Sequence, residues 1–156
     1  NEDPHCSIDS LIQYSDGILV LIGGSYSLIS SLLLDNNINE CEFLIKKIQK
    51  IFNENIYIEI QRHSEKHEPE LENRLLEFSS KLSIPIIATH EVFYMNKDMH
   101  EAHDAYVCVG QKTYVNDLKR LQYSNQHYFK TTEEMKELFK DLPEALENNF
   151  LLPSKM

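Results

Sequence analysis

The sequence predicts an α/β fold, specifically part of a parallel β/α barrel followed by C-terminal helices. Three short apolar runs read as strands: Ile18–Ile22, Ile56–Gln61 and the run from Ile84 that ends at His90 and Glu91. Segments with helical spacing of apolar residues separate these runs, and such alternation is typical of crossover units with a parallel sheet. Because three strands do not complete a barrel, we expect the natural protein to continue on the N-terminal side of this sequence.

Composition limits the class of protein. The chain has 156 residues, of which 42% are hydrophobic, and no apolar run approaches the roughly 18 residues of a membrane helix. A formal net charge of -10 argues against a nucleic-acid surface on this segment. Cys6, Cys41 and Cys108 form no C-x-x-C pair, so we expect a reduced, cytoplasmic protein with no membrane contact.

The N-terminal half contains three expected helices around the first strand. Ser7 can cap a short helix that Gly17 ends, and a second helix is expected over 27–34. The third runs from about Ile38 to Phe52, with its apolar residues on one stripe. The first strand stops at Gly23 and Gly24, where the backbone can approach a neighbour closely.

The C-terminal half continues the alternation. A helix is expected from near Pro69 to Leu82. After Tyr94, Asp98 can cap a helix that Gly110 follows. Its apolar residues are Ala102, Ala105, Tyr106 and Val109. Residues 111–129 read as a long loop, which is usually functional or packed on another element. Thr131 to Glu134 offers a capping box for a helix to about Lys140, and Pro143 opens a last helix.

Chemistry-bearing residues follow each expected strand. The strands end at Gly24, at His63, and at His90 with Glu91. In a right-handed parallel arrangement these ends meet at one edge of the sheet. Imidazole and carboxylate together suit a divalent transition metal, which could activate water for phosphoester hydrolysis. The alternative is that these side chains are caps and hydrogen-bond partners.

Two further sets are weaker candidates. His63 with His67, and His100 with His103, have spacings that could share a face, but without a zincin glutamate we favour solvated or capping roles. In the long loop, tyrosines alternate with basic residues. This pattern could bind a nucleic-acid strand, but packing and solvated charge are favoured because the chain is acidic. The residues are Lys112, Tyr114, Lys119, Arg120, Tyr123, Tyr128 and Lys130.

Four stretches carry a family resemblance. They are Ile56–His63, Ile86–Tyr94, the motif His100-Glu101-Ala102-His103-Asp104-Ala105, and 128–145 with its Lys-Thr-Thr-Glu-Glu core. In this order they resemble the polymerase-and-histidinol-phosphatase (PHP) domain of the bacterial DNA polymerase III alpha subunit. The strand that ends at Gly23 and Gly24 is also similar to a strand of this family.

The resemblance implies a distorted parallel β/α barrel, of which this chain would be the C-terminal portion. Residues 1–130 would belong to the barrel, and 131–156 would form a helical segment leading toward the polymerase body. The family's N-terminal His-x-His strand and the polymerase palm carboxylates are absent from the sequence, so no catalytic residue is expected in this segment.

The resemblance also implies a degenerate metal site. His63 matches one ligand, and Glu91 stands where an aspartate ligand is usual. Phe93 stands where a histidine ligand is expected, and Gly24 where metal-binding members carry a cysteine. We therefore expect a vestigial site at His63 and Glu91, since stable transition-metal sites need about four ligands. No cofactor is expected on this segment, and Mn or Zn would bind only if the site were intact.

The implied function is that of the parent enzyme, template-directed DNA synthesis by a nucleotidyltransferase with Mg in its polymerase site. The segment itself would be a scaffold or docking site for the proofreading exonuclease, in contact with the rest of the polymerase chain and reaching DNA only through the parent. Two alternatives stay open: a still-active metal-dependent exonuclease or phosphoesterase, and a stand-alone binding module from a split gene. Exposed strand edges would also predict self-association.

Overall fold

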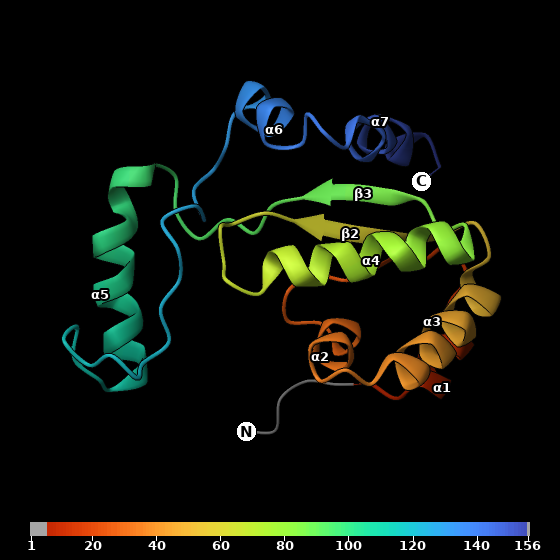
Figure 1. The fold of residues 1–156 in the computed structure, drawn as a ribbon, viewed down its shortest axis with the longest axis horizontal. Helices are drawn as coiled ribbons and strands as arrows, with labels where there is room; N and C mark the ends of the chain where they lie inside the picture. Colours follow the sequence, from red (N-terminus) through yellow and green to blue (C-terminus); the bar gives the residue numbers. More distant parts are fainter. Residues whose placement is uncertain (1–5, 156) are drawn as a thin grey trace.

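The computed structural model describes residues 6–155, and a parallel sheet with strand order β1-β2-β3 lies at the centre of this part of the chain (Figure 1). The strands are β1 (Val20–Ile22), β2 (Ile56–Gln61) and β3 (Ile86–Thr89). Ile58 pairs in register with Ile22 on one side and with Ile86 on the other. The predicted α/β class and parallel pairing are confirmed. The sheet is open in the described part of the chain, with β1 and β3 at its edges.

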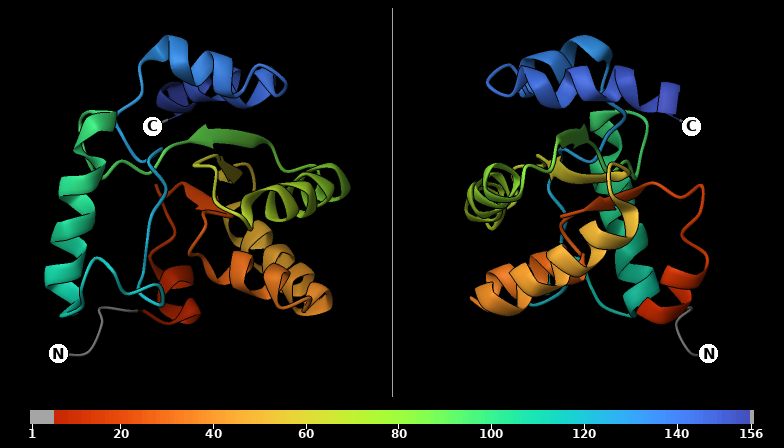
Figure 2. Two further views of the ribbon diagram at one scale, coloured as in Figure 1. Left: turned by 60° about the vertical axis from the view of Figure 1, so that its left-hand side comes forward. Right: turned by 90° about the vertical axis from the view of Figure 1, so that its right-hand side faces the viewer.

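Helices surround the sheet and extend past its ends (Figures 1 and 2). Their bounds are α1 (Ile8–Gln13), α2 (Leu28–Leu34), α3 (Ile38–Phe52), α4 (Glu68–Leu82), α5 (His100–Gln111), α6 (Thr132–Leu138) and α7 (Pro143–Leu151), with short 3-10 turns η1 (Lys97–Met99) and η2 (Leu152–Lys155). Most of these segments lie where sequence periodicity predicts them. The predicted caps of α1 and α6 are present, including both hydrogen bonds of the capping box between Thr131 and Glu134, and Ser27 caps α2 in the same way as Ser7 caps α1.

The main core lies between the sheet and helices α2, α3 and α4. Alternate residues of β2, Ile56, Ile58 and Ile60, are fully buried because they point toward this helical layer. The apolar stripes of α3 and α4 supply the opposite side of the core. Their buried apolar members are Cys41, Ile45, Phe52, Leu71, Leu75 and Phe78.

Helix α7 covers the outer edge of β3. The side-chain amides of Asn148 and Asn149 donate to the Ile86 and Ala88 carbonyl oxygens, at 2.7 and 2.8 Å. These carbonyls point away from β2, so a further strand would otherwise have bonded to them. The prediction of exposed strand edges is therefore wrong for β3.

Arg62, just after β2, connects α4 to the C-terminal helices. Its guanidinium donates to Glu72 of α4 at 2.5 Å and to Asp141 at 2.7 Å, and also to the carbonyl oxygen of Leu138. It lies 4.8 Å from the ring centre of Phe139, which is fully buried. Its hydrogen bonds lower the pKa of Asp141 to about 2. The end of β2 thus fixes α6 and α7.

Helix α5 departs most from expectation. Gly110 lies inside it, and Asp98 belongs to η1 rather than capping the helix. The apolar residues predicted for this helix all lie on its exposed side: Ala102, Ala105, Tyr106 and Val109. Figure 1 shows why, because α5 stands beyond the strand ends and away from the layer of α2, α3 and α4. Periodicity identified the helix but not its environment.

Strand lengths also differ modestly. The first strand begins at Val20 rather than Ile18, and β3 stops at Thr89. In the described part of the chain, no helix has both the length and the apolar character needed to cross a membrane.

Candidate functional site at the carboxyl ends of the strands

The predicted residues do meet at one edge of the sheet. The backbone N–H of Glu91, beyond β3, donates to Nε2 of His63, beyond β2, at 3.0 Å. On the β1 side, Gly24 lies against the side chains of Glu59 and Gln61 from β2. The parallel register produces this convergence, since it aligns Gln61 with Thr89 at the strand ends.

His63 is at the centre of the site and is almost completely buried. Its Nδ1 lies 2.9 Å from a carboxylate oxygen of Glu68, and its Nε2 faces the backbone N–H of Glu91. Because Nε2 accepts a hydrogen bond, the ring proton is on Nδ1 and is donated to Glu68. Both ring nitrogens are therefore occupied by groups of this chain.

Glu68, the first residue of α4, collects donors from the turn that follows β2. It accepts the backbone N–H of His63 at 2.8 Å and that of Glu65 at 3.0 Å, besides the imidazole. Burial by itself would raise the pKa of Glu68, but the hydrogen bonds from His63 and Glu65 outweigh it and lower the pKa. The carboxylate is thus kept charged inside the protein.

His90 and Glu91 have perturbed acidities for related reasons. Burial, with neighbouring His63 and Lys130, lowers the pKa of His90 to about 4, although its Nε2 bonds to the Gln126 carbonyl oxygen at 2.9 Å. Burial raises the pKa of Glu91, and His63 opposes that shift. A neutral imidazole and a weakened acid therefore adjoin His63.

Aromatic and imidazole rings form a stacked column through the site. Going outward, ring centres are separated by 4.4 Å from His90 to His63, 4.1 Å from His63 to His127, 4.7 Å from His127 to Phe93 and 5.3 Å from Phe93 to His103. Their planes are inclined by 25° or less. We call these five rings the ring column. Phe93, placed by the resemblance at a lost ligand position, is one of its members.

His127 is the main site residue that sequence reasoning missed. It is 2% exposed, and its Nε2 has no hydrogen-bond partner, the nearest carboxylate oxygen being that of Glu65 at 3.6 Å. Burial lowers its pKa, reinforced by His63. The only available signal was the length of the loop that carries it, which indicated a functional or packed segment.

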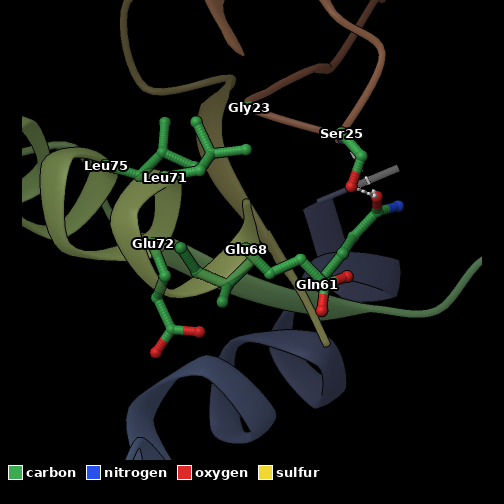
Figure 3. Close-up of a pocket in the computed structure, with 8 residues that line it drawn as sticks. Gly23, Ser25, Gln61, Glu68, Leu71, Glu72 and Leu75 are labelled. Atoms are coloured by element: carbon green, nitrogen blue, oxygen red, sulfur yellow. Dashed lines mark hydrogen bonds between the residues drawn. The ribbon is translucent and has the colours of Figure 1, made fainter. Parts of the chain in front are cut away.

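Around Gly24, polar side chains fill the opposite side of the strand ends. Glu59 accepts from the Thr89 hydroxyl at 2.6 Å, and Gln61 accepts from the backbone N–H of Ser25 at 3.2 Å. A Cβ added at Gly24 would lie 2.6 Å from the Glu59 carboxylate. Figure 3 shows the small pocket beside this network, with Ser25 and Gln61 turned toward each other.

The side chains do not fit the metal cluster that the resemblance associates with this domain. Coordination by His63 would require the Nε2 lone pair that the Glu91 N–H already uses, and Phe93 offers no donor atom. Within residues 6–155, no three His, Cys, Asp or Glu side chains are grouped to hold a metal ion. The pairing of His63 with Glu68 does have the form of a ligand and its supporting carboxylate.

The structure gives different roles to the weaker candidates from the sequence, which are the histidines of α5 and the tyrosines of the long loop. His103 is in the ring column and His100 bonds to the Tyr123 carbonyl oxygen, so neither has the solvated or capping role favoured from spacing. Tyr123 packs edge-on against Phe93, whereas Tyr114 is 84% exposed. The C-terminal end of the loop thus contributes packing residues to the site.

Comparison with known proteins begins with a family model that matches part of the chain. The model of the PHP domain family matches residues 1–63, the stretch that ends at the central histidine of the site.

The particular relatives are DNA polymerases. The chain is 34% identical over 151 residues to DNA polymerase III subunit alpha of Rickettsia bellii, covering 97% of this chain and 13% of that protein. Identity is 35% over 153 residues with the same subunit of Borreliella burgdorferi, covering 97% and 13%, and 31% over 156 residues with that of Haemophilus influenzae, covering 99% and 14%.

The resemblance seen in the sequence is therefore confirmed. The chain is homologous to the PHP region of bacterial DNA polymerase III alpha subunits, and it spans only 13% to 14% of the length of these three relatives.

Proposed function

We propose that this chain is a segment of the alpha subunit of a bacterial replicative DNA polymerase, in which it acts as a scaffold rather than as a catalytic centre. The parent protein would carry out template-directed DNA synthesis, with Mg in a polymerase site outside this segment. The observation that carries the scaffold role is the occupation of both His63 ring nitrogens by Glu68 and by the Glu91 backbone. Such a histidine supports packing and has no free lone pair for metal chemistry.

The partner in this proposal is the separate proofreading exonuclease. A docking surface should display apolar side chains that the domain itself leaves uncovered. The outer side of α5 supports this, because Tyr106 and Val109 are 77% and 76% exposed. Ala102 and Ala105 lie on the same side of the helix.

One alternative function has specific support. The pairing of Glu68 with His63 is the usual arrangement behind a metal-bound histidine, and Glu65, Glu91 and His127 lie close by. A metal-dependent exonuclease or phosphoesterase that binds Mn or Zn is therefore the second candidate, and metal binding would require the Glu91 backbone N–H to release Nε2 of His63. A stand-alone module from a split gene is the third.

The size of the native chain separates the polymerase proposal from the split-gene alternative. An antibody raised against this segment should detect, in cells of the source organism, a band many times larger than 18.3 kDa. A band near that mass would contradict the polymerase proposal.

Metal analysis of the full-length protein tests the scaffold role. We expect no Mn or Zn to remain after gel filtration in chelator-free buffer, for the wild type and for Glu91→Ala alike. Bound metal that Glu91→Ala removes would favour the phosphoesterase alternative.

Docking is tested by coprecipitation of the exonuclease with full-length protein. Val109→Asp, on the exposed face of α5, should reduce recovery of the exonuclease. Phe43→Asp is the matched control, since Phe43 is also exposed, at 71%, but lies on α3. Equal recovery with both variants would argue against α5 as the docking surface.

A further inference from the structure

Residues 95–128 form an arm that lies outside the main core. The arm comprises η1, α5 and the segment that returns to the strand ends, and Figures 1 and 2 show it beyond the carboxyl ends of the strands. Tyr106 and Val109 of its helix point to solvent, and Cys108 is the one buried residue of that helix. A broad buried apolar stripe, which fixes α3 and α4, is therefore not what fixes α5.

The ring column instead connects this helix to the sheet. His103 of α5 stacks on Phe93, Phe93 on His127, and His127 on His63 at the end of β2. The planes of the last pair differ by only 4°. Phe93 is thus the ring between the helix and the returning segment.

Hydrogen bonds hold the returning segment but not α5 directly. The backbone N–H of Phe93 donates to the His127 carbonyl oxygen at 2.9 Å, and that of Ser124 donates to Glu65 at 2.8 Å. The helix is joined to this segment within the arm, by His100 to the Tyr123 carbonyl oxygen and by the ion pair of Asp104 with Arg120. Contact between α5 and the segment after β3 is made by rings: His103 stacks on Phe93 at 5.3 Å and also lies 5.3 Å from Tyr94, which is 6.1 Å from His100.

We infer that the ring column holds the arm of residues 95–128 in a fixed position at the strand ends, with Phe93 as its positioning residue. Stacking of Phe93 between His127 and His103 joins the end of β3 to the returning segment and to α5. The inference goes beyond the proposed function, because it concerns what orders the arm and holds whichever protein docks there.

Hydrogen exchange on the full-length protein, read by mass spectrometry on peptides from 95–128, tests this inference. Phe93→Ala should raise exchange of the α5 amides by about tenfold or more, because exchange reports the local opening equilibrium. Phe93→Tyr keeps the ring and should preserve protection. Phe129→Ala is the control, since it removes a ring that is 62% exposed and outside the column.

A second variant and a chelator serve as further controls in the hydrogen-exchange experiment. His103→Ala removes only the outer ring and should loosen α5 while peptides from β2 and α4 stay protected. A chelator should leave wild-type exchange unchanged. Unaltered exchange of α5 in both Phe93→Ala and His103→Ala would overturn the inference, as would a chelator that loosens the wild-type arm. None of these outcomes depends on whether the exonuclease binds, so failure of this inference is distinct from failure of the docking proposal.

Discussion

The core under α3 and α4 and the ring column at the strand ends are built in different ways. In the core, apolar residues at regular spacing pack two helices on alternate residues of β2. In the ring column, the rings come from the ends of β2 and β3, from α5 and from a long loop. The first needs only local periodicity, whereas the second needs the whole fold to be in place. The core should therefore dominate stability, and the ring column should dominate local order.

The largest expected effect is in the core. Ile58→Ala removes a fully buried side chain from the middle of β2 and should lower the free energy of unfolding by about 3 kcal/mol, as buried large-to-small changes do. Urea denaturation measures this. Leu118→Ala, at a site that is 89% exposed in the arm, should change it by less than about 0.5 kcal/mol. Similar losses in both variants would contradict the distinction between core and arm.

Next comes the buried carboxylate behind His63. Glu68→Ala leaves the Nδ1 proton of His63 and two backbone N–H groups without their acceptor, which should cost about 2 kcal/mol. Thermal and urea denaturation would both report the loss. Glu70→Ala removes an exposed carboxylate from the same helix, whose i,i+4 pair with Arg74 contributes only about 0.3 to 0.5 kcal/mol. If Glu68→Ala were as mild as this control, the hydrogen bonds to Glu68 would not be important for stability.

The pH dependence of the free energy of unfolding should reflect titration of His90 in the site, because the core contains apolar residues that do not titrate in the acidic range. His90 has a pKa of about 4 in the folded chain against 6.5 ordinarily, so the unfolded chain binds more protons between these values. This contribution to stability is complete above about pH 6.5 and is lost progressively as pH falls toward 4. Melting temperatures over this range should fall with acidification, and His90→Gln should flatten the profile. A wild-type profile that rose on acidification would contradict the assignment.

The smallest effects come from two glycines and should have opposite signs. Gly24→Ala forces the Glu59 carboxylate away from its place beside Thr89 and should cost about 1 kcal/mol. Gly110→Ala meets open space inside α5 and should stabilise by up to about 1 kcal/mol. Differential scanning calorimetry of both variants checks the contrast, and shifts of the same sign would refute it.

The sequence predicts the sheet and its helices well because their signals are local. The bounds of α3 and β2 follow directly from periodicity of 3.6 and 2. Helix α5 shows the limit of this signal. Ala102, Ala105, Tyr106 and Val109 have the same helical spacing as a buried stripe, yet they face solvent. Periodicity reports that a face is apolar and does not identify what covers it.

For the site, the parallel arrangement predicts which strand ends meet, and His63 does lie against Glu91. It does not predict the partners supplied by distant segments. His127 reaches His63 because the loop folds back over a separation that no motif marks, and Glu68 acts as an acceptor only once α4 begins at that residue. The predicted metal ligands His63 and Glu91, and the lost positions at Gly24 and Phe93, stay predictions until metal binding is measured.

The two asparagines of α7 determine which edge of the sheet can pair with a further strand. Because Asn148 and Asn149 occupy the outward carbonyls of β3, that edge is closed to another strand. β1 is the other edge of the sheet in the described chain, and Leu21 on it is partly exposed. Any strand added by another part of a longer polypeptide, or by a second molecule, would have to join at β1, so the segment is built to be extended from one side only.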